Sequence, residues 1–250
     1  MPGFPAPADP LTPMRLLEEA RERGVRVLQI ADNLPLDPCS AAELDALARA
    51  AAGFGIALET GTRGISRDVL ERYLAISQRL GSRMLRTLMD GTESNAVEQL
   101  RACAGEFERA GVVLAIENHD RLPSADLRRI IDQVGSPAVG ICLDTANSLG
   151  CGEGVATVLA ELLRLTVNVH LKDFQVRRLL HGKGFQVTGT PAGQGLLDIP
   201  RLLAQLRAAG RDVNCILELW SEPEPTVAES IAKENRWVDE SLRYLRALIP

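Results

Sequence analysis

The chain alternates between short apolar runs rich in β-branched residues and longer stretches in which apolar residues recur every three or four positions. The first pattern predicts buried strands and the second predicts amphipathic helices. Strands are expected at residues 25–32, 55–60, 84–89, 112–118, 139–145, 166–173 and 214–220. Helices are expected at residues 11–24, 40–55, 66–81, 94–111, 123–135, 154–165, 199–210 and 227–248. Regular alternation of the two element types is typical of an α/β protein with a parallel sheet.

The strand-and-helix unit repeats about every 27 residues, and no linker of changed composition interrupts it. We therefore expect one domain over residues 1–250, a length typical of a (β/α)8 TIM barrel. Only seven strands are expected, because the first helix follows the proline-rich segment 1–11. Proline lacks the N–H group that a central strand needs. The prediction is a (β/α)8 TIM barrel whose first strand is missing or irregular.

The segment 174–198 is too long for an ordinary connection between a strand and the next helix. It is expected to be a long active-site loop that caps the mouth of the barrel, with a solvated insertion as the alternative. Arg177 and His181 would then bind hydroxyl or carboxylate groups of a substrate. The sequence GTPAGQG within this segment also offers backbone N–H groups to an anion.

Four of the expected strands end on a side chain that can bind a metal ion: Glu117, Asp144, His170 and Glu218. Neighbouring members of this set are 27, 26 and 48 residues apart along the chain, which corresponds to one strand-and-helix unit twice and then to one unit plus the long loop. Because the carboxyl ends of the strands of a parallel barrel meet at one mouth, the four side chains are expected to converge there. Three carboxylates and one imidazole suit a hard or borderline divalent ion, so the sequence predicts one site for Mn²⁺, with Mg²⁺ or Co²⁺ as alternatives.

Further polar residues are expected near the same mouth. His119, Asn147 and Lys172 follow the strand ends at Glu117, Asp144 and His170, and are candidates for substrate binding. On the earlier strands, Asp32, Asn33, Glu59 and Arg86 lie at or near carboxyl ends. Glu59 and Arg86 are expected either to pair inside the barrel or to bind substrate, and Arg86 would suit a carboxylate or keto oxygen.

Composition narrows the class of protein. Hydrophobic residues make up 46% of the chain, which is enough for a substantial core, and the net charge of −5 argues against a nucleic-acid partner. Five scattered cysteines with no CxxC spacing predict free thiols in a reducing compartment. No apolar stretch is long enough to span a membrane, and the first residues lack the features of a secretory signal. A cytoplasmic protein without membrane association is expected.

Five motifs together resemble the xylose-isomerase-like TIM barrels, the group of sugar isomerases and epimerases that includes tagatose and psicose 3-epimerases, hydroxypyruvate isomerases and inosose dehydratases. The motifs are IENHD, LDTANS, HLKD, GTPAGQG and LELW. The resemblance implies that Glu117, Asp144, His170 and Glu218 bind one divalent ion, and that Glu117 and Glu218 also act as the acid/base pair. In the 3-epimerases a histidine usually stands three residues after the metal-binding aspartate, whereas this chain has Asn147 there.

The leading hypothesis is a metal-dependent sugar isomerase or epimerase. A metal that chelates a carbonyl and its neighbouring hydroxyl acidifies the carbon-bound proton and stabilises an ene-diolate, while one glutamate removes the proton and another returns it. The alternative is a lyase that dehydrates a keto-cyclitol or cleaves a 3-keto-glycoside. A nuclease is disfavoured by the acidic charge and the three histidines. A non-catalytic, degenerate carbohydrate-binding barrel is a further alternative, because a missing strand would leave an open seam. A homo-oligomer in which a partner covers this seam is also expected.

Overall fold

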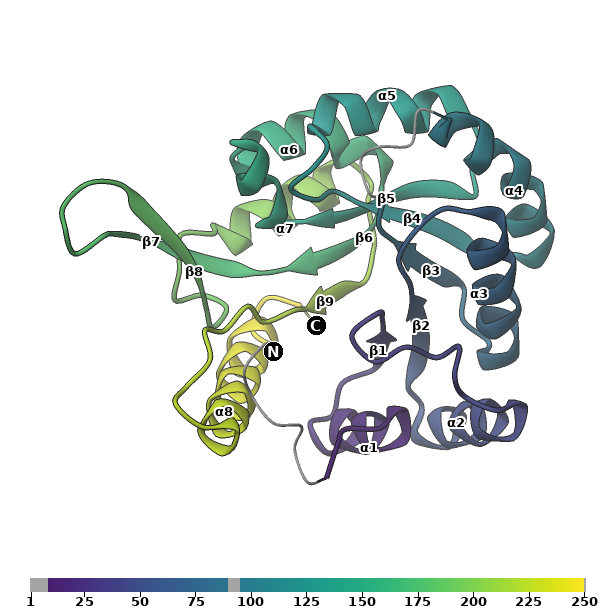
Figure 1. Cartoon of the computed structure of the whole chain (residues 1–250), viewed down its shortest axis with the longest axis horizontal. Coiled ribbons are helices and arrows are strands. Elements are labelled where there is room, and N and C mark those ends of the chain that lie inside the picture. The colour runs from purple at the N-terminus through teal and green to yellow at the C-terminus, as the bar shows by residue number, and fades with distance from the viewer. Residues whose placement is uncertain (1–8, 90–94, 250) are drawn as a thin grey trace.

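The computed structural model describes residues 9–89 and 95–249, in which seven parallel strands surround a central axis and helices cover their outer side (Figure 1). Hydrogen bonds order the strands β1-β2-β3-β4-β5-β6-β9. The strands are β1 (Val27–Ile30), β2 (Ala57–Gly61), β3 (Met84–Thr87), β4 (Val113–Glu117), β5 (Val139–Asp144), β6 (Thr166–Leu171) and β9 (Cys215–Leu217). The seven predicted strands are confirmed in order and in parallel direction, with ends that differ by up to three residues.

Eight α-helices are present within the described residues, as the apolar spacing predicts, and the first of them precedes β1. They are α1 (Pro13–Glu22), α2 (Ala41–Phe54), α3 (Arg67–Leu80), α4 (Ala96–Ala110), α5 (Ser124–Val134), α6 (Val155–Leu162), α7 (Ile199–Ala208) and α8 (Val227–Leu245). Two short 3₁₀ helices, η1 (Asn147–Cys151) and η2 (Leu163–Leu165), flank α6. Capping residues determine where several of these helices begin and end. Ser40 and Glu43 form a capping box at the start of α2, and Gly55 ends that helix in the left-handed conformation that glycine adopts readily.

The barrel has a seam between β1 and β9. These strands lie near each other, but no hydrogen-bonded ladder joins them in the part of the chain that the structure describes. No strand precedes α1 from residue 9 onward, and the rest of the predicted irregular segment, residues 1–8, lies outside the described residues. Two helices of the same chain, α1 and α8, cover the seam from outside, where Arg23 donates hydrogen bonds to Asn235 (2.7 Å) and Asp239 (3.1 Å). A partner subunit is therefore not required to cover it.

Most of the segment 174–198, predicted as a long active-site loop, belongs to a hairpin of two strands. Strands β7 (Asp173–Arg178) and β8 (Phe185–Thr190) form an antiparallel hairpin that projects from the barrel (Figure 1). Gly182 and Gly184 adopt positive φ angles in the turn, a conformation that glycine allows at no steric cost. The expectation that this segment caps the mouth is not met, because the outer half of the hairpin is exposed and points away from the barrel.

A buried carboxylate anchors the hairpin to the barrel. Asp173 is 3% exposed and accepts four backbone hydrogen bonds. Its Oδ1 accepts from the N–H groups of Phe174 (2.8 Å) and Leu197 (3.1 Å), and its Oδ2 accepts from those of Gly193 (2.8 Å) and Gly195 (2.9 Å). The N–H groups of Gly193 and Gly195 in the GTPAGQG segment therefore bind an anion, as the sequence suggests, but that anion is the carboxylate of the chain itself.

Most of the apolar side chains form one core between the strands and the helices, and a second small cluster lies inside the barrel. This inner cluster consists of Met84, Ala115 and Cys142, and two of its members are completely buried. It lies below the predicted metal-binding residues, because Cys142 precedes Asp144 by two positions on β5 and alternate residues of a strand share a face. None of the described helices is long and apolar enough to cross a membrane.

Candidate active site

The four predicted metal ligands come together at the carboxyl ends of their strands. Glu117 ends β4, Asp144 ends β5, His170 is the penultimate residue of β6, and Glu218 directly follows β9. One nitrogen or oxygen atom from each side chain lies within 4.8 Å of the corresponding atom of every other. The parallel register aligns them, because Asp144 pairs with His170 and Ile216, two residues before Glu218, pairs with His170 as well.

Three of these side chains present polar atoms that have no hydrogen-bond partner although they are buried. They are Asp144 Oδ2, His170 Nδ1 and Glu218 Oε2. His170 Nδ1 and Glu218 Oε2 lie 2.7 Å apart without hydrogen-bond alignment. These atoms are held by ion contacts, such as that between Lys172 Nζ and Asp144 Oδ2 (3.0 Å), and not by aligned hydrogen bonds, so they remain able to bind a ligand. An N,O set of this composition fits a divalent ion.

Glu117 differs from the other members because both of its oxygens are engaged. Arg86 Nε donates to Oε2, and Asn147 Nδ2 donates to Oε1 at 2.7 Å. Burial alone would raise the pKa of Glu117, but His170, Arg86 and Lys172 hold that pKa well below its ordinary value. Glu117 is therefore a fixed anion over the whole physiological pH range.

Lys172 is the second buried cation at the site. Its Nζ lies 3.0 Å from both Asp144 Oδ2 and Glu218 Oε1. Burial opposes its charge, but Asp144, Glu218 and Glu117 raise the pKa of Lys172 above its ordinary value, so the ammonium stays protonated. Four carboxylates, including that of Asp32, face two permanent cations, Arg86 and Lys172.

His170 is held by the residues around it. Its Nε2 contacts Gln29 Oε1 at 2.7 Å, which turns Nδ1 toward Glu117 (3.2 Å) and Glu218 (2.7 Å). Burial opposes protonation, but Cys142 and the two carboxylates raise the pKa of His170 well above its ordinary value. In the protein without metal the imidazole is therefore protonated at neutral pH.

Asp144 is oriented by its own backbone and by Asn118. The Asn118 side chain accepts from the N–H group of Asp144 (2.8 Å) and donates to its carbonyl oxygen (2.9 Å). Asp144 Oδ1 accepts from the N–H groups of Ala146 (2.8 Å) and Asn147 (2.7 Å), which leaves Oδ2 for the cluster. Burial raises the pKa of Asp144. Asn118 and Gln29 were not among the predicted site residues, and the only sequence signal for Asn118 was its position after Glu117.

Four of the remaining predicted residues lie at the cluster or in the cavity that contains it. Arg86, Asn147 and Lys172 contact the cluster directly, and His119 lines the same cavity. Arg86 pairs with Glu117 and Asp32 (2.7 Å).

Three predicted residues lie outside the cluster. Glu59 lies deeper in the barrel, where it accepts hydrogen bonds from Gln29, Asn168 and Asn214. Its expected pairing with Arg86 is therefore replaced by amide partners. Arg177 and His181 are exposed on the projecting hairpin and do not line the cavity that contains the cluster.

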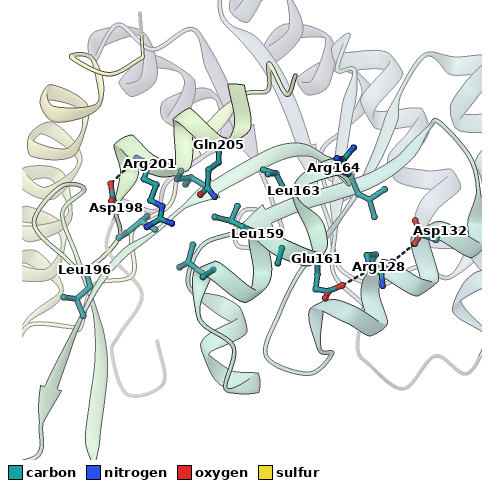
Figure 2. A pocket seen from close by; sticks show the side chains of 16 residues that line it. Arg128, Asp132, Leu159, Glu161, Leu163, Arg164, Leu196, Asp198, Arg201 and Gln205 are labelled. Carbon is teal, nitrogen blue, oxygen red and sulfur yellow. Dashed lines mark hydrogen bonds and ion pairs between the residues drawn. The ribbon is translucent and has the colours of Figure 1, made fainter. Parts of the chain in front are cut away.

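The protein has a cavity at the mouth of the barrel and another on its outer side, and either could bind a substrate. A cavity of about 860 Å³ contains Glu117, His170 and Glu218 and extends toward the seam between β1 and β9. A second cavity, of about 1000 Å³, lies outside the barrel between α6 and α7 (Figure 2). Figure 2 shows that charged groups in the outer cavity pair with one another, since Arg128 contacts both Glu161 and Asp132. The chemistry therefore concentrates in the inner cavity.

Comparison with known proteins gives a consistent picture. The sequence profile described as xylose isomerase-like TIM barrel matches residues 16–248. The chain is 35% identical to a protein named 3-oxo-isoapionate decarboxylase from Pectobacterium atrosepticum, over 95% of this chain and 88% of that protein.

Two solved structures share the fold. One is a D-psicose 3-epimerase crystallised with D-fructose, with a TM-score of 0.73 and 17% identity over 94% of this chain and 92% of that one. The other is a xylose isomerase-like TIM barrel protein from Mycobacterium smegmatis in complex with magnesium, with a TM-score of 0.69 and 17% identity over 96% of this chain and 94% of that one.

Proposed function

Since the chain belongs to the xylose isomerase-like TIM-barrel family, we propose that it is a divalent-metal-dependent enzyme that decarboxylates a small 3-oxo sugar acid. The proposal makes the protein a lyase, the class that sequence analysis kept as its alternative, although that alternative specified dehydration or glycoside cleavage. Support comes from the 35% identity to a decarboxylase and from the unequal surroundings of Glu117 and Glu218.

The difference between the two glutamates is the observation on which the proposal rests. An epimerase or isomerase of the expected kind needs two groups that exchange protons with the substrate. Glu117 is poorly suited to this task, because Arg86 and Asn147 occupy both of its oxygens and its pKa is well below the ordinary value. His170 and Lys172 lower the pKa of Glu218 as well, but Glu218 is more accessible than Glu117, with 39% of its side chain exposed, and its contacts are ion pairs to His170 (2.7 Å) and Lys172 (3.0 Å). One proton donor is sufficient for decarboxylation.

In the proposed reaction the bond between the carboxylate carbon and its neighbouring carbon breaks and CO₂ leaves. The electron pair moves onto the oxygen of the 3-oxo group as an enolate forms. A bound divalent ion, Mn²⁺ in this proposal, would act as a Lewis acid on that oxygen. Asp144, His170, Glu218 and Glu117 would hold the ion, and Lys172 would place a permanent positive charge beside the developing negative charge. A water molecule held by the Glu218 carboxylate would deliver the proton that completes the product, and the hydroxide left behind would take a proton from solvent.

Epimerisation remains a second candidate because Glu117 and Glu218 both contact His170 Nδ1 and thus flank one point. It requires Glu117 to release its contacts with Arg86 and Asn147 during turnover. The small-molecule substrate class, a keto sugar or keto sugar acid, is common to both candidates.

The two reactions are separated by incubating the Mn²⁺-loaded protein with 3-oxo-isoapionate and, in parallel, with D-fructose in deuterated buffer. We expect stoichiometric CO₂ release from the 3-oxo acid and no deuterium incorporation into D-fructose. Glu218→Gln should lower the rate of CO₂ release by about 10²-fold or more, the usual contribution of a positioned acid. Rapid exchange of a carbon-bound proton without CO₂ release would instead establish the epimerase.

A further inference from the structure

The thiol of Cys142 lies directly beneath the four-residue cluster. Cys142 is completely buried on β5 and is paired in register with Glu117 on β4. Its Sγ donates a long, weak hydrogen bond to Asn168 Oδ1 (3.6 Å). Neither the proposed reaction nor the hard-ion site uses this side chain.

Cys142 completes a second group of ligand atoms. One atom each from Glu117, Cys142 and His170 lies within 4.8 Å of the other two. His170 Nδ1 is buried without an aligned hydrogen bond and lies 3.2 Å from Glu117 Oε2, so it faces this group as well as the four-residue cluster. We propose that the barrel contains a second, overlapping metal-binding set of Glu117, Cys142 and His170, which selects thiophilic divalent ions such as Cd²⁺ and Zn²⁺.

The selectivity follows from the chemistry of the ligands. Thiolate sulfur is a soft donor that Zn²⁺ accepts readily, whereas carboxylate oxygens suit Mg²⁺ and Mn²⁺. Zn–S bonds of about 2.3 Å and Zn–N and Zn–O bonds of about 2.0–2.2 Å place neighbouring tetrahedral ligands about 3.5 Å apart. The three side chains therefore need to approach one another by up to about 1.3 Å to close around an ion. On binding, the Cys142 thiol loses its proton to the buffer and its sulfur forms the bond to the metal.

The two sets share Glu117 and His170, so they cannot be filled at the same time by two ions. A thiophilic ion would sit one layer deeper in the barrel than a hard ion, away from Asp144 and Glu218. It would therefore displace Mn²⁺ and remove the Lewis acid from the substrate. Thiophilic binding is independent of the reaction that the site catalyses, so its test does not depend on the proposed decarboxylation.

The test is titration of chelator-stripped wild-type protein with Cd²⁺, followed by the ultraviolet charge-transfer absorption of a cadmium–thiolate bond. Cys142→Ser should abolish this band and weaken Cd²⁺ binding at least about tenfold, as expected for loss of a soft ligand. The same variant should retain its Mn²⁺ affinity within about twofold, because the hard-ion ligands are intact. Cys215→Ser is the matched control, since Cys215 lies on β9, which pairs with β6, and is outside the group. It should leave both affinities and the band unchanged.

A direct measurement on the wild type avoids the risk that Cys142→Ser misfolds. The ¹¹³Cd NMR resonance of the one-to-one complex should show the downfield shift of a cadmium ion with one sulfur ligand. A resonance typical of oxygen and nitrogen ligands alone would overturn the proposal, as would a charge-transfer band that survives in Cys142→Ser. Loss of the band in Cys215→Ser would assign the binding to a different thiol and would equally overturn it.

Discussion

Replacement of Asp173 should destabilise the protein through four identifiable hydrogen bonds. Its Oδ1 accepts hydrogen bonds from the N–H groups of Phe174 and Leu197, which are buried residues. Its Oδ2 accepts hydrogen bonds from the N–H groups of Gly193 and Gly195, which are more accessible. Asp173→Ala leaves two donors buried and unsatisfied at about 1–3 kcal/mol each and returns two donors to water at about 0.5–1.5 kcal/mol each. The expected loss in the free energy of unfolding is thus about 6 kcal/mol, within a range of about 3–9 kcal/mol.

Asp173→Asn separates the two pairs of bonds. The amide oxygen can still accept from the buried pair, while the amide nitrogen faces the N–H groups of Gly193 and Gly195. The expected loss is about 2 kcal/mol, one third of that for alanine. The assay is urea unfolding followed by far-ultraviolet circular dichroism. Asp212→Ala, at an exposed position, is the control and should change stability by less than about 0.5 kcal/mol.

The reasoning would be refuted if Asp173→Ala cost less than about 1 kcal/mol, because the unsatisfied donors alone exceed that figure. Equal losses for Asp173→Ala and Asp173→Asn would also contradict it, since they would show that the charge, and not the number of acceptor bonds, anchors the hairpin. A changed slope of unfolding free energy against urea concentration would indicate that the hairpin unfolds separately.

Four further predictions follow from the same structure. Gly189→Ala places a Cβ 1.9 Å from the carbonyl oxygen of Trp220, so the thermal midpoint should fall by an amount equivalent to about 1–3 kcal/mol. Asn147→Ala removes the donor to Glu117 Oε1 and should weaken Mn²⁺ binding in calorimetry about tenfold; an unchanged affinity would show that Glu117 needs no such support. His170 is protonated in the metal-free protein and must lose that proton to bind metal. Mn²⁺ affinity should therefore rise up to about tenfold per pH unit below the raised pKa, with about one proton released per ion, as titration in buffers of different ionisation enthalpy would show. A homo-oligomer remains expected, although Arg23 links α1 to α8 beside the seam. Solution scattering should give the mass of an oligomer, and a monomeric mass would contradict the expectation.

The barrel was predictable because its signals are local and repeated. Each strand is a short apolar run and each helix has a regular apolar face, and parallel topology then brings the ends of successive strands to one mouth. The convergence of Glu117, Asp144, His170 and Glu218 follows from that rule alone. The absence of a strand before α1 from residue 9 onward also agrees with the sequence, since proline cannot supply the N–H groups that a central strand needs.

Other features depend on contacts between distant residues and left no signal of their own. The hairpin was missed because its anchor, Asp173, acts on N–H groups about twenty residues away. The hydrogen bonds that Arg86 and Asn147 donate to Glu117 connect residues at the ends of β3, β4 and β5. Charge and residue type made each of these residues a candidate, but only the folded arrangement shows that Glu117 is fully engaged while Glu218 is available.

The central claim is that four side chains at the strand ends bind one divalent ion. Calorimetric titration of chelator-stripped protein with Mn²⁺ tests it most directly, with His170→Ala as the variant and His119→Ala as the matched control, since His119 lines the same cavity outside the cluster. The account predicts one-to-one binding that is lost in His170→Ala and retained in His119→Ala. Absence of binding in the wild type, or equal binding in His170→Ala, would contradict it.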